Sequence, residues 1–449
     1  MEKSKLSSRI WFNLVLFGFM GQVAWAVENV YFNTFLFNFI GGDAGDISLM
    51  VSLSAATAVA TTFIMGTLSD KLNKRKIFIS GGYILWGLTV AVFALISREN
   101  VASFFNISNG TKAVAATVSI VIIMDCIMTF MGSTSNDAAF NAWITDVTVP
   151  SNRGVAEGAL AVMPVLSTLL VTVAFGAGVT AVGYPVCFIG LGALVTLCGV
   201  VGFFSLKDSR SGVREKGDYL NELIYGFRPS VIKENKSLYL VLAAVCIFSS
   251  AVQVFLPYMF LYIQHFLKFD FNSLAENLSP KLILTAVAAL AAFVAVVILL
   301  GKLLDKFGKG KFVYPSIVIF IVGLVASSFA KKIGIFAVFA ALMFCGYGLL
   351  MIILNASVRD FTPEDKAGLF QGIRMIFFVL IPMIVGPFIG KTVINAFAGN
   401  YAAGQYINDY GEAVNAPVPE IFIAAAIISV FIIIPMVFVR KKLSGGNEK

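Results

Sequence analysis

The chain has 449 residues, of which 58% are hydrophobic and only 13% are charged, and its formal net charge is +8. Soluble domains carry about 25% charged residues, so this composition excludes an ordinary soluble protein. Apolar runs of about 18 or more residues, long enough to cross a bilayer, recur along the whole chain. The sequence therefore predicts an all-α polytopic membrane protein.

Twelve apolar stretches, separated by charged or turn-rich segments, are the predicted transmembrane helices. In chain order they are residues 10–40, 47–69, 77–97, 113–145, 154–182, 184–206, 238–267, 281–301, 312–330, 333–358, 367–397 and 419–439. Several exceed the about 20 residues that a bilayer requires, which predicts tilted, kinked or protruding helices. The fifth and sixth stretches are separated only at Gly183-Tyr184.

The lysines and arginines predict the orientation. With a cytoplasmic N-terminus, 25 of the 33 lie in inside segments and six in outside loops, while Arg374 and Lys391 lie within a span. This bias follows the positive-inside rule, so we expect a protein of the inner plasma membrane with both termini in the cytoplasm. The positive net charge reflects that topology and indicates no nucleic-acid partner.

The longest polar interruption divides the predicted helices into two sets of six. We therefore predict an N-terminal six-helix bundle at 1–206, a cytoplasmic central loop at 207–237, and a C-terminal six-helix bundle with a short tail at 238–449. Six helices, an even number, lie between corresponding points of the two halves, so both halves have the same orientation in the membrane. This pattern is typical of two pseudo-symmetric bundles that face each other across a central cavity.

A charged loop follows the second helix of each half. Residues 66–76 (GTLSDKLNKRK) match residues 301–311 (GKLLDKFGKGK) at six of eleven positions, offset by 235 throughout. A second repeat joins the fourth and fifth helices, where Asp146 and Arg153 correspond to Asp360 and Lys366.

These repeated loops, with twelve spans split by a basic central loop, resemble the major facilitator superfamily over essentially the whole chain. The resemblance implies a secondary transporter whose loop acids and bases form a cytoplasmic charge network that breaks as the halves rock. The residues at these gate positions are Asp70, Lys74, Arg75, Asp305 and Lys309. A plain positive-inside signal would explain the basic residues, but it would not explain the two aspartates.

The first predicted helix carries polar groups where water should be scarce. Asn29 and Asn33 each lie within about 20° of Gln22 at 100° per residue, with Trp25 adjoining them. A lipid-facing surface would not carry three amides, so we expect this stripe to line the cavity. Glu28 lies at its edge, where it could meet either the cavity or a neighbouring helix.

The fourth predicted helix carries two carboxylates, Asp125 and Asp137, and Asn136 shares the face of Asp125. Ionisable groups inside a span are costly and are functional candidates by default. Together with Glu28 they could hold H⁺ or Na⁺, and their oxygens could accept hydrogen bonds from sugar hydroxyls. The alternative is a structural ion pair, such as Asp137 with Arg374.

Residues 136–146, followed by Arg153, resemble the fourth-helix signature of the glycoside–pentoside–hexuronide:cation symporters. That resemblance gives Asp137 the sugar-binding position, Phe140 the aromatic position, and Asp146 with Arg153 the helix end. The acids that bind Na⁺ in that family would fall on Ala58 and Thr62. We therefore expect H⁺ rather than Na⁺ as the coupling ion.

The second half adds three candidate binding residues. Gln253 and Tyr258 give the seventh helix a hydrogen-bonding face, although aromatic packing is the commoner role of such a tyrosine. Arg374 on the eleventh helix could bind an anionic sugar or pair with an acid. The five cysteines lie in apolar segments without metal-ligand spacing, and we expect them to be small core residues.

The sequence contains no phosphate-binding P-loop, and its single histidine belongs to no catalytic pattern, so we expect neither an ATP-driven pump nor an enzyme. The predicted function is a cation-coupled sugar or glycoside symporter that works by alternating access. An exporter of drugs or other metabolites is the alternative, and a sensor built on a transporter fold is a third class. We expect a monomer in the lipid bilayer that needs no cofactor or metal beyond the coupling ion.

Overall fold

The computed structural model describes residues 6–72, 74–148, 150–208, 226–269, 309–363, 367–408 and 410–444. Among these residues, ten helices are long and apolar enough to cross a membrane. One of them, Gly158–Ser205, contains most of the predicted fifth span and all but the last residue of the sixth, and the predicted span 281–301 lies outside the described residues. The predicted fold class, an all-helical polytopic membrane protein, is therefore confirmed, and its count of twelve helices is consistent with this structure.

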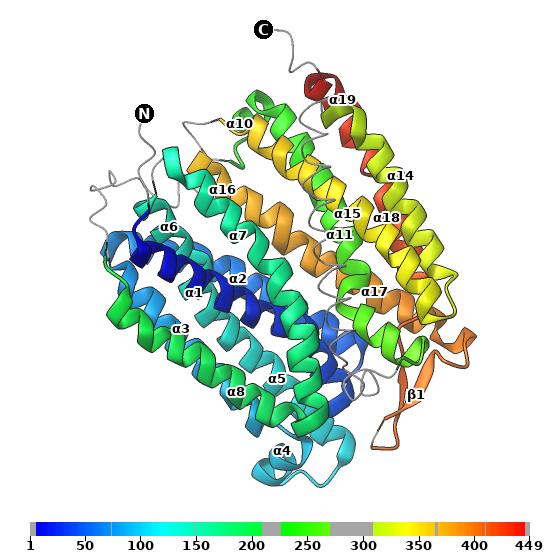
Figure 1. The fold of residues 1–449 in the computed structure, drawn as a ribbon. Helices are drawn as coiled ribbons and strands as arrows, with labels where there is room; N and C mark the ends of the chain where they lie inside the picture. The colour runs from blue at the N-terminus through cyan, green and yellow to red at the C-terminus, as the bar shows by residue number, and fades with distance from the viewer. Residues whose placement is uncertain are drawn as a thin grey trace. The chain divides into compact units, whose positions relative to one another are not determined.

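The chain divides into two compact units, an N-terminal unit at Met1–Gly217 and a C-terminal unit at Asp218–Lys449. Figure 1 shows the helices of the N-terminal unit in blue to green. They are α1 (Ser8–Val27), α2 (Ala44–Leu72), α3 (Arg75–Val92), α4 (Arg98–Phe105), α5 (Gly110–Gly132), α6 (Asn141–Val147), α7 (Pro150–Leu170) and α8 (Gly176–Ser205).

Short π-helical segments interrupt or extend several of these helices. They are η1 (Glu28–Phe32), η2 (Phe35–Ile40), η4 (Ser133–Phe140) and η5 (Val171–Phe175), and a 3₁₀ turn, η3 (Phe93–Leu95), ends α3. A π-helical segment is rare, occurs often at functional sites, and changes which face of the helix the following residues occupy. Two of these segments, η1 and η4, contain predicted site residues.

Helices α3 and α8 lie side by side in Figure 1 and pack closely through glycines. A Cβ added at Gly87 would lie 2.4 Å from the carbonyl oxygen of Gly192, and one added at Gly192 would lie 2.5 Å from that of Gly87. Small residues bring helix backbones together in this way inside membranes, where association depends on close packing.

We expect Gly87→Ala to destabilise the N-terminal unit by about 1–3 kcal/mol, because the added methyl group meets backbone atoms that cannot move aside. Gly81→Ala is the matched control on the same helix, since a Cβ there meets nothing within 4 Å. Thermal unfolding of each purified variant, followed by tryptophan fluorescence, gives the two melting temperatures. Equal melting temperatures for the two variants would show that α3 and α8 are not in contact at this point.

The boundary between the predicted fifth and sixth spans is a break inside α8. Gly183 has φ 81° and ψ 166°, a backbone conformation that is open to glycine and strained for other residues. Pro185 follows two residues later and cannot donate the helical backbone hydrogen bond. The continuous apolar run is thus two helical segments joined at the residue where the sequence predicted the division.

The C-terminal unit contains a second set of helices, drawn from green to red in Figure 1. They are α10 (Pro229–Glu234), α11 (Lys236–Leu261), α14 (Lys309–Ser328), α15 (Ile333–Phe361), α16 (Ala367–Met375), α17 (Ile381–Phe397), α18 (Glu420–Val430) and α19 (Ile433–Ser444). The short segments η6 (Tyr262–Phe266) and η8 (Ile376–Leu380) are π-helical, and η9 (Ala398–Asn400) is a 3₁₀ turn. Helix α11 packs against α17 and α18, and α14 packs against α15.

A small antiparallel hairpin, β1 (Gln405–Ile407) and β2 (Ala413–Asn415), precedes α18. The rings of Tyr406 and His265 stack with centroids 4.1 Å apart, which holds β1 against the end of η6. The Tyr401 hydroxyl donates to the Glu420 carboxylate at 2.6 Å, and this bond raises the pKa of Tyr401 to about 12. Tyr401 therefore remains a donor at neutral pH and links the segment before the hairpin to the start of α18.

Candidate coupling and substrate site

Glu28 lies where the first, second and fourth predicted spans meet inside the N-terminal unit. Its Oε1 accepts a hydrogen bond from the Ser54 hydroxyl of α2 at 2.9 Å and one from the Thr129 hydroxyl of α5 at 3.2 Å. The two hydroxyl oxygens are themselves 2.7 Å apart. The carboxylate is therefore bound to two neighbouring helices, and of the two positions that the sequence allowed, the structure shows contact with a neighbouring helix.

Asp125 belongs to the same cluster. Its side chain is 1% exposed and lies near enough to Glu28 for the charges of the two carboxylates to interact. Asp125 Oδ1 and Glu28 Oε2 are both buried and have no hydrogen-bond partner among the described residues. The Glu28–Asp125 cluster, meaning these two acids with Ser54 and Thr129, thus holds two carboxylates with unused acceptor atoms, which is costly unless a cation or a proton binds there.

Asp137 occupies a different position on the π-helical segment η4 and is half-buried. Its Oδ2 accepts a hydrogen bond from the Ser133 hydroxyl at 3.0 Å, and its Oδ1 accepts one from the Asn136 amide at 3.3 Å. The Trp25 side chain lies near this carboxylate. Asp137 is thus a carboxylate held by several donors beside an indole ring.

Asn136 fixes the geometry around Asp137. Its amide oxygen lies 3.1 Å from the Tyr83 hydroxyl, which also donates to the Phe17 carbonyl at 2.6 Å. Gly21 on α1 permits this arrangement, because a Cβ there would lie 2.4 Å from the amide oxygen. Asn136 is 5% exposed and donates to the Asp137 carboxylate from within the packed bundle.

The prediction that Gln22, Asn29 and Asn33 share one open face of the first span is wrong for Asn33. Asn29 is exposed and Gln22 is half-buried, but Asn33 is 3% exposed and donates to the Asn29 carbonyl at 2.9 Å. The reason is η1, whose π-helical turns replace the 100° per residue of an α-helix between Glu28 and Phe32. The residues after it are rotated away from the face that an α-helix would give them.

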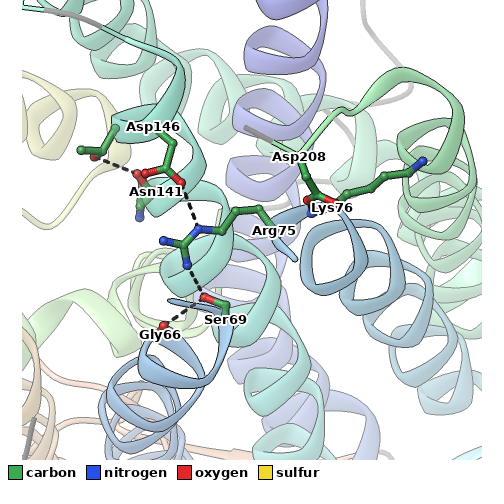
Figure 2. Close-up of polar contacts among 8 residues, drawn as sticks. Gly66, Ser69, Arg75, Lys76, Asn141, Asp146 and Asp208 are labelled. Carbon is green, nitrogen blue, oxygen red and sulfur yellow. Dashed lines mark hydrogen bonds and ion pairs between the residues drawn. The ribbon is translucent and has the colours of Figure 1, made fainter. Parts of the chain in front are cut away.

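The structure joins two predicted gate residues in one ion pair, shown in Figure 2. Arg75 Nε lies 3.1 Å from Asp146 Oδ2, and Arg75 Nη1 donates to the Ser69 hydroxyl at 2.5 Å. Ser69 in turn donates to the Gly66 carbonyl at 3.0 Å. The side chains of Arg75 and Asp146 are 6% and 14% exposed, so this pair links the start of α3, the end of α2 and α6 in a nearly buried setting.

The other predicted gate residues are described less fully. Lys74 is exposed and lies at the cap position before α3. The side chains of Asp70 and Arg153 lie outside the described residues, as does that of Lys309 at the start of α14. Asp305 lies outside the described residues altogether.

Asp208 is a structural partner that the sequence did not indicate. Its carboxylate accepts a hydrogen bond from the backbone N–H of Lys76 at 2.8 Å, as Figure 2 shows. The first N–H groups of a helix lack partners within the helix, and a carboxylate at this end is favoured by the helix dipole. The residues after α8 therefore cap α3, next to the Arg75–Asp146 pair.

The three candidates of the C-terminal unit have different environments. Arg374 donates to the Asn355 amide oxygen at 3.3 Å and lies over the Phe378 ring, with its guanidinium carbon 5.0 Å from the centroid. Gln253 is half-buried against Gly386. Tyr258 is fully buried and donates to the Pro387 carbonyl at 2.9 Å, which makes it a packing residue and not part of an open binding face.

Sequence reasoning missed Ser54. A serine within an apolar helix has no pattern of its own, and only the packing of α2 against its neighbours brings it to Glu28 and Thr129. Its position four residues before Ala58, where the symporters that the fourth-helix signature resembles carry an acid, was the one signal in the sequence that pointed to this face of the helix.

The fold is that of a polytopic membrane protein. The chain belongs to the Major Facilitator Superfamily, whose family model matches residues 11–387 and 273–448, and it is therefore a transporter and not an enzyme.

Solved structures of this superfamily share the fold at low sequence identity. The nucleoside transporter NupG is 12% identical with a TM-score of 0.66, over 96% of this chain and 98% of that chain. A bacterial homolog of the human lysosomal transporter Spinster, in an inward-facing and unoccupied conformation, is 13% identical with a TM-score of 0.62, over 98% and 96%. No curated protein sequence matches the chain.

Proposed function

We propose that this transporter is a proton-coupled symporter of sugars or glycosides that works by alternating access. The observation that carries the proposal is Asp137, a half-buried carboxylate beside Trp25 that is distinct from the Glu28–Asp125 cluster. A symporter needs one group for its substrate and one for its coupling ion, and the two sets of acids supply them.

The chemistry around Asp137 fits a polyhydroxylated substrate. A carboxylate accepts hydrogen bonds from paired hydroxyls, and a bond to a charged group is worth about 1.5–3 kcal/mol. Trp25 offers an aromatic face with its ring 5.0 Å from that of Trp86. Nucleosides are a reasonable second group of substrates to test, because a ribose offers similar hydroxyls and one structural relative is a nucleoside transporter.

Proton coupling is proposed over sodium coupling for two reasons. Ala58 and Thr62 stand where the related sugar symporters carry their sodium-binding acids. The Glu28–Asp125 cluster instead offers two buried carboxylates whose free oxygens are able to bind a proton. We also propose that the protein lies in the inner plasma membrane as a monomer with both termini in the cytoplasm, as the lysine and arginine bias predicts.

The test is uptake into proteoliposomes from a panel of glycosides, free sugars and nucleosides. We expect at least one glycoside or sugar to accumulate when the outside is acidic, and accumulation to stop when a protonophore removes the gradient. Accumulation that requires Na⁺ instead would contradict proton coupling. Uptake of nucleosides alone, or loss of preloaded drugs from the vesicles, would replace the proposed substrate class.

A further inference from the structure

We infer that the coupling proton binds to Glu28 Oε1, where the hydroxyls of Ser54 and Thr129 complete a ring of three oxygens that is one proton short. These three oxygens are called the hydroxyl ring below. The inference rests on the proposed function, because it assigns the proton of that symporter to one of its three acids and to one oxygen of that acid. It also makes Ser54 and Thr129 positioning residues for the coupling step.

The three oxygens of the hydroxyl ring are in mutual contact. Ser54 Oγ lies 2.9 Å from Glu28 Oε1, Thr129 Oγ1 lies 3.2 Å from the same atom, and the two hydroxyl oxygens are 2.7 Å apart. The serine is 5% exposed and the threonine is 1% exposed, so these contacts lie within the packed unit. Because the residues belong to η1, α2 and α5, the ring joins three helical segments.

The number of protons in the ring decides which form of Glu28 fits it. A hydroxyl donates one hydrogen bond and has two lone pairs to accept others, whereas the oxygens of an ionised carboxylate only accept. With Glu28 ionised, the ring holds two protons, which can make only two of its three contacts hydrogen bonds. A third proton on Oε1 lets every oxygen donate once and accept once, from Glu28 to Ser54, from Ser54 to Thr129, and from Thr129 back to Glu28. The three close contacts therefore fit the protonated form of Glu28.

The other carboxyl oxygen, Glu28 Oε2, is buried and has no hydrogen-bond partner among the described residues. A proton placed there would have no acceptor among the contacts of the structure, and the ring would still be one proton short. A proton on Oε1 instead makes Oε2 the carbonyl oxygen of a neutral acid, whose burial costs less than that of a charged carboxylate. Oε1 is therefore the better position for the proton.

The titratable groups that face Glu28 are all acidic. Asp125 and Cys126 face it from α5, and Asp137 faces it from η4, while α2 presents the uncharged hydroxyl of Ser54. No lysine, arginine or histidine of the described part of the chain forms an ion pair with Glu28. Two ionised carboxylates at this depth repel each other strongly, so a proton on Glu28 also removes its repulsion with Asp125.

Proton uptake and release at the ring balance without a further reactant. Uptake forms one O–H bond on Glu28 Oε1 and converts a hydronium ion into water, and release breaks that bond and returns the proton to water. Ser54 and Thr129 keep their own protons and only rotate their hydroxyls. The pair thus makes two hydrogen bonds with ionised Glu28 and completes three with protonated Glu28. It binds both forms, as is required around a group that must gain and lose a proton in every cycle.

Infrared difference spectra of the full-length protein in lipid test the inference without knowledge of the substrate. On acidification we expect a protonated carboxyl band that Glu28→Gln removes, at the high frequency of a carbonyl oxygen that accepts no hydrogen bond. The double variant Ser54→Ala with Thr129→Val should shift this band to still higher frequency, because the acid O–H then loses its acceptors. The control is Thr117→Val on the same helix as Thr129, since the buried Thr117 hydroxyl donates to the Ala113 carbonyl at 2.7 Å.

Three spectroscopic results would overturn the inference. The first is the absence of any carboxyl band that depends on Glu28, or a band that the double variant leaves unchanged. The second is a band at the low frequency of a carbonyl that accepts hydrogen bonds, because the proton then lies on Oε2 and the hydroxyls bind the carbonyl. The third is a band that NaCl removes and choline chloride does not, because the site then binds Na⁺.

Uptake by the same variants gives the second readout. For a substrate that the wild-type protein accumulates, Ser54→Ala and Thr129→Val should each reduce uptake driven by a pH gradient about 10-fold, which corresponds to about 1.4 kcal/mol. The double variant should lose no more than either single one, because one change already opens the ring. Exchange of substrate at equal concentrations should persist, since it needs no net proton movement.

The conservative variants Ser54→Thr and Thr129→Ser keep a hydroxyl in the ring and should retain driven uptake, which loss of packing alone would not explain. Unchanged driven uptake in both Ser54→Ala and Thr129→Val, or losses that add in the double variant, overturns the inference. A wild-type protein that transports nothing in the panel, yet shows the expected carboxyl band, contradicts only the proposed function.

Discussion

Replacing Asp137 by asparagine should reduce the initial rate of concentrative sugar uptake about 100-fold or more, because a neutral amide loses two charge-assisted hydrogen bonds to substrate hydroxyls at about 1.5–3 kcal/mol each. The amide also conflicts with its surroundings. Ser133 and Asn136 donate to different oxygens of Asp137, at 3.0 and 3.3 Å, and the NH₂ group that replaces one oxygen in asparagine cannot accept its bond. Initial rates in proteoliposomes measure the effect.

The control for this variant is Asn141→Ala, one helical turn further along the same segment. Asn141 is exposed, and its amide donates to the Asp137 backbone carbonyl at 3.0 Å, so its removal leaves the carboxylate in place. Both variants should elute as folded, monodisperse protein. Full uptake by folded Asp137→Asn would remove Asp137 from the substrate site.

The spans could be predicted because the membrane imposes a simple requirement of length and apolarity on each helix. That requirement also located the division at Gly183-Tyr184, where the structure has its break. It did not locate the π-helical segments, because they change the hydrogen bonding of a helix without changing its composition. For that reason Asn33 was assigned to an open face and is in fact buried.

At the candidate site, the sequence likewise predicted the charged residues but not their contacts. Glu28, Asp125 and Asp137 were conspicuous as single charged residues in apolar runs, and the sequence named all three. It could not show that Glu28 binds Ser54 and Thr129 beside Asp125 while Asp137 lies near Trp25, because helix pairing is a property of packing between distant segments. The hairpin before α18 was likewise missed, since its two strands are only three residues each.

Arg75 and Asp146 were predicted separately, from a loop motif and from a helix-end signature, and the structure places them 3.1 Å apart. Removing one member of a nearly buried pair leaves the other charge without compensation. We therefore expect Arg75→Met to lower the free energy of unfolding by about 3–5 kcal/mol. Chemical denaturation of the protein in detergent, followed by tryptophan fluorescence, measures the loss.

The matched control is Lys74→Ala, which removes a positive charge from the adjacent residue. Lys74 is exposed, so its removal should change stability by no more than about 0.5 kcal/mol. Combining Arg75→Met with Asp146→Leu removes both charges, and much of the lost stability should return because apolar replacements of a buried pair are often neutral. If the double variant is instead as unstable as the sum of its single changes, the two side chains do not interact, and the ion pair cannot be the link that holds α2, α3 and α6 together.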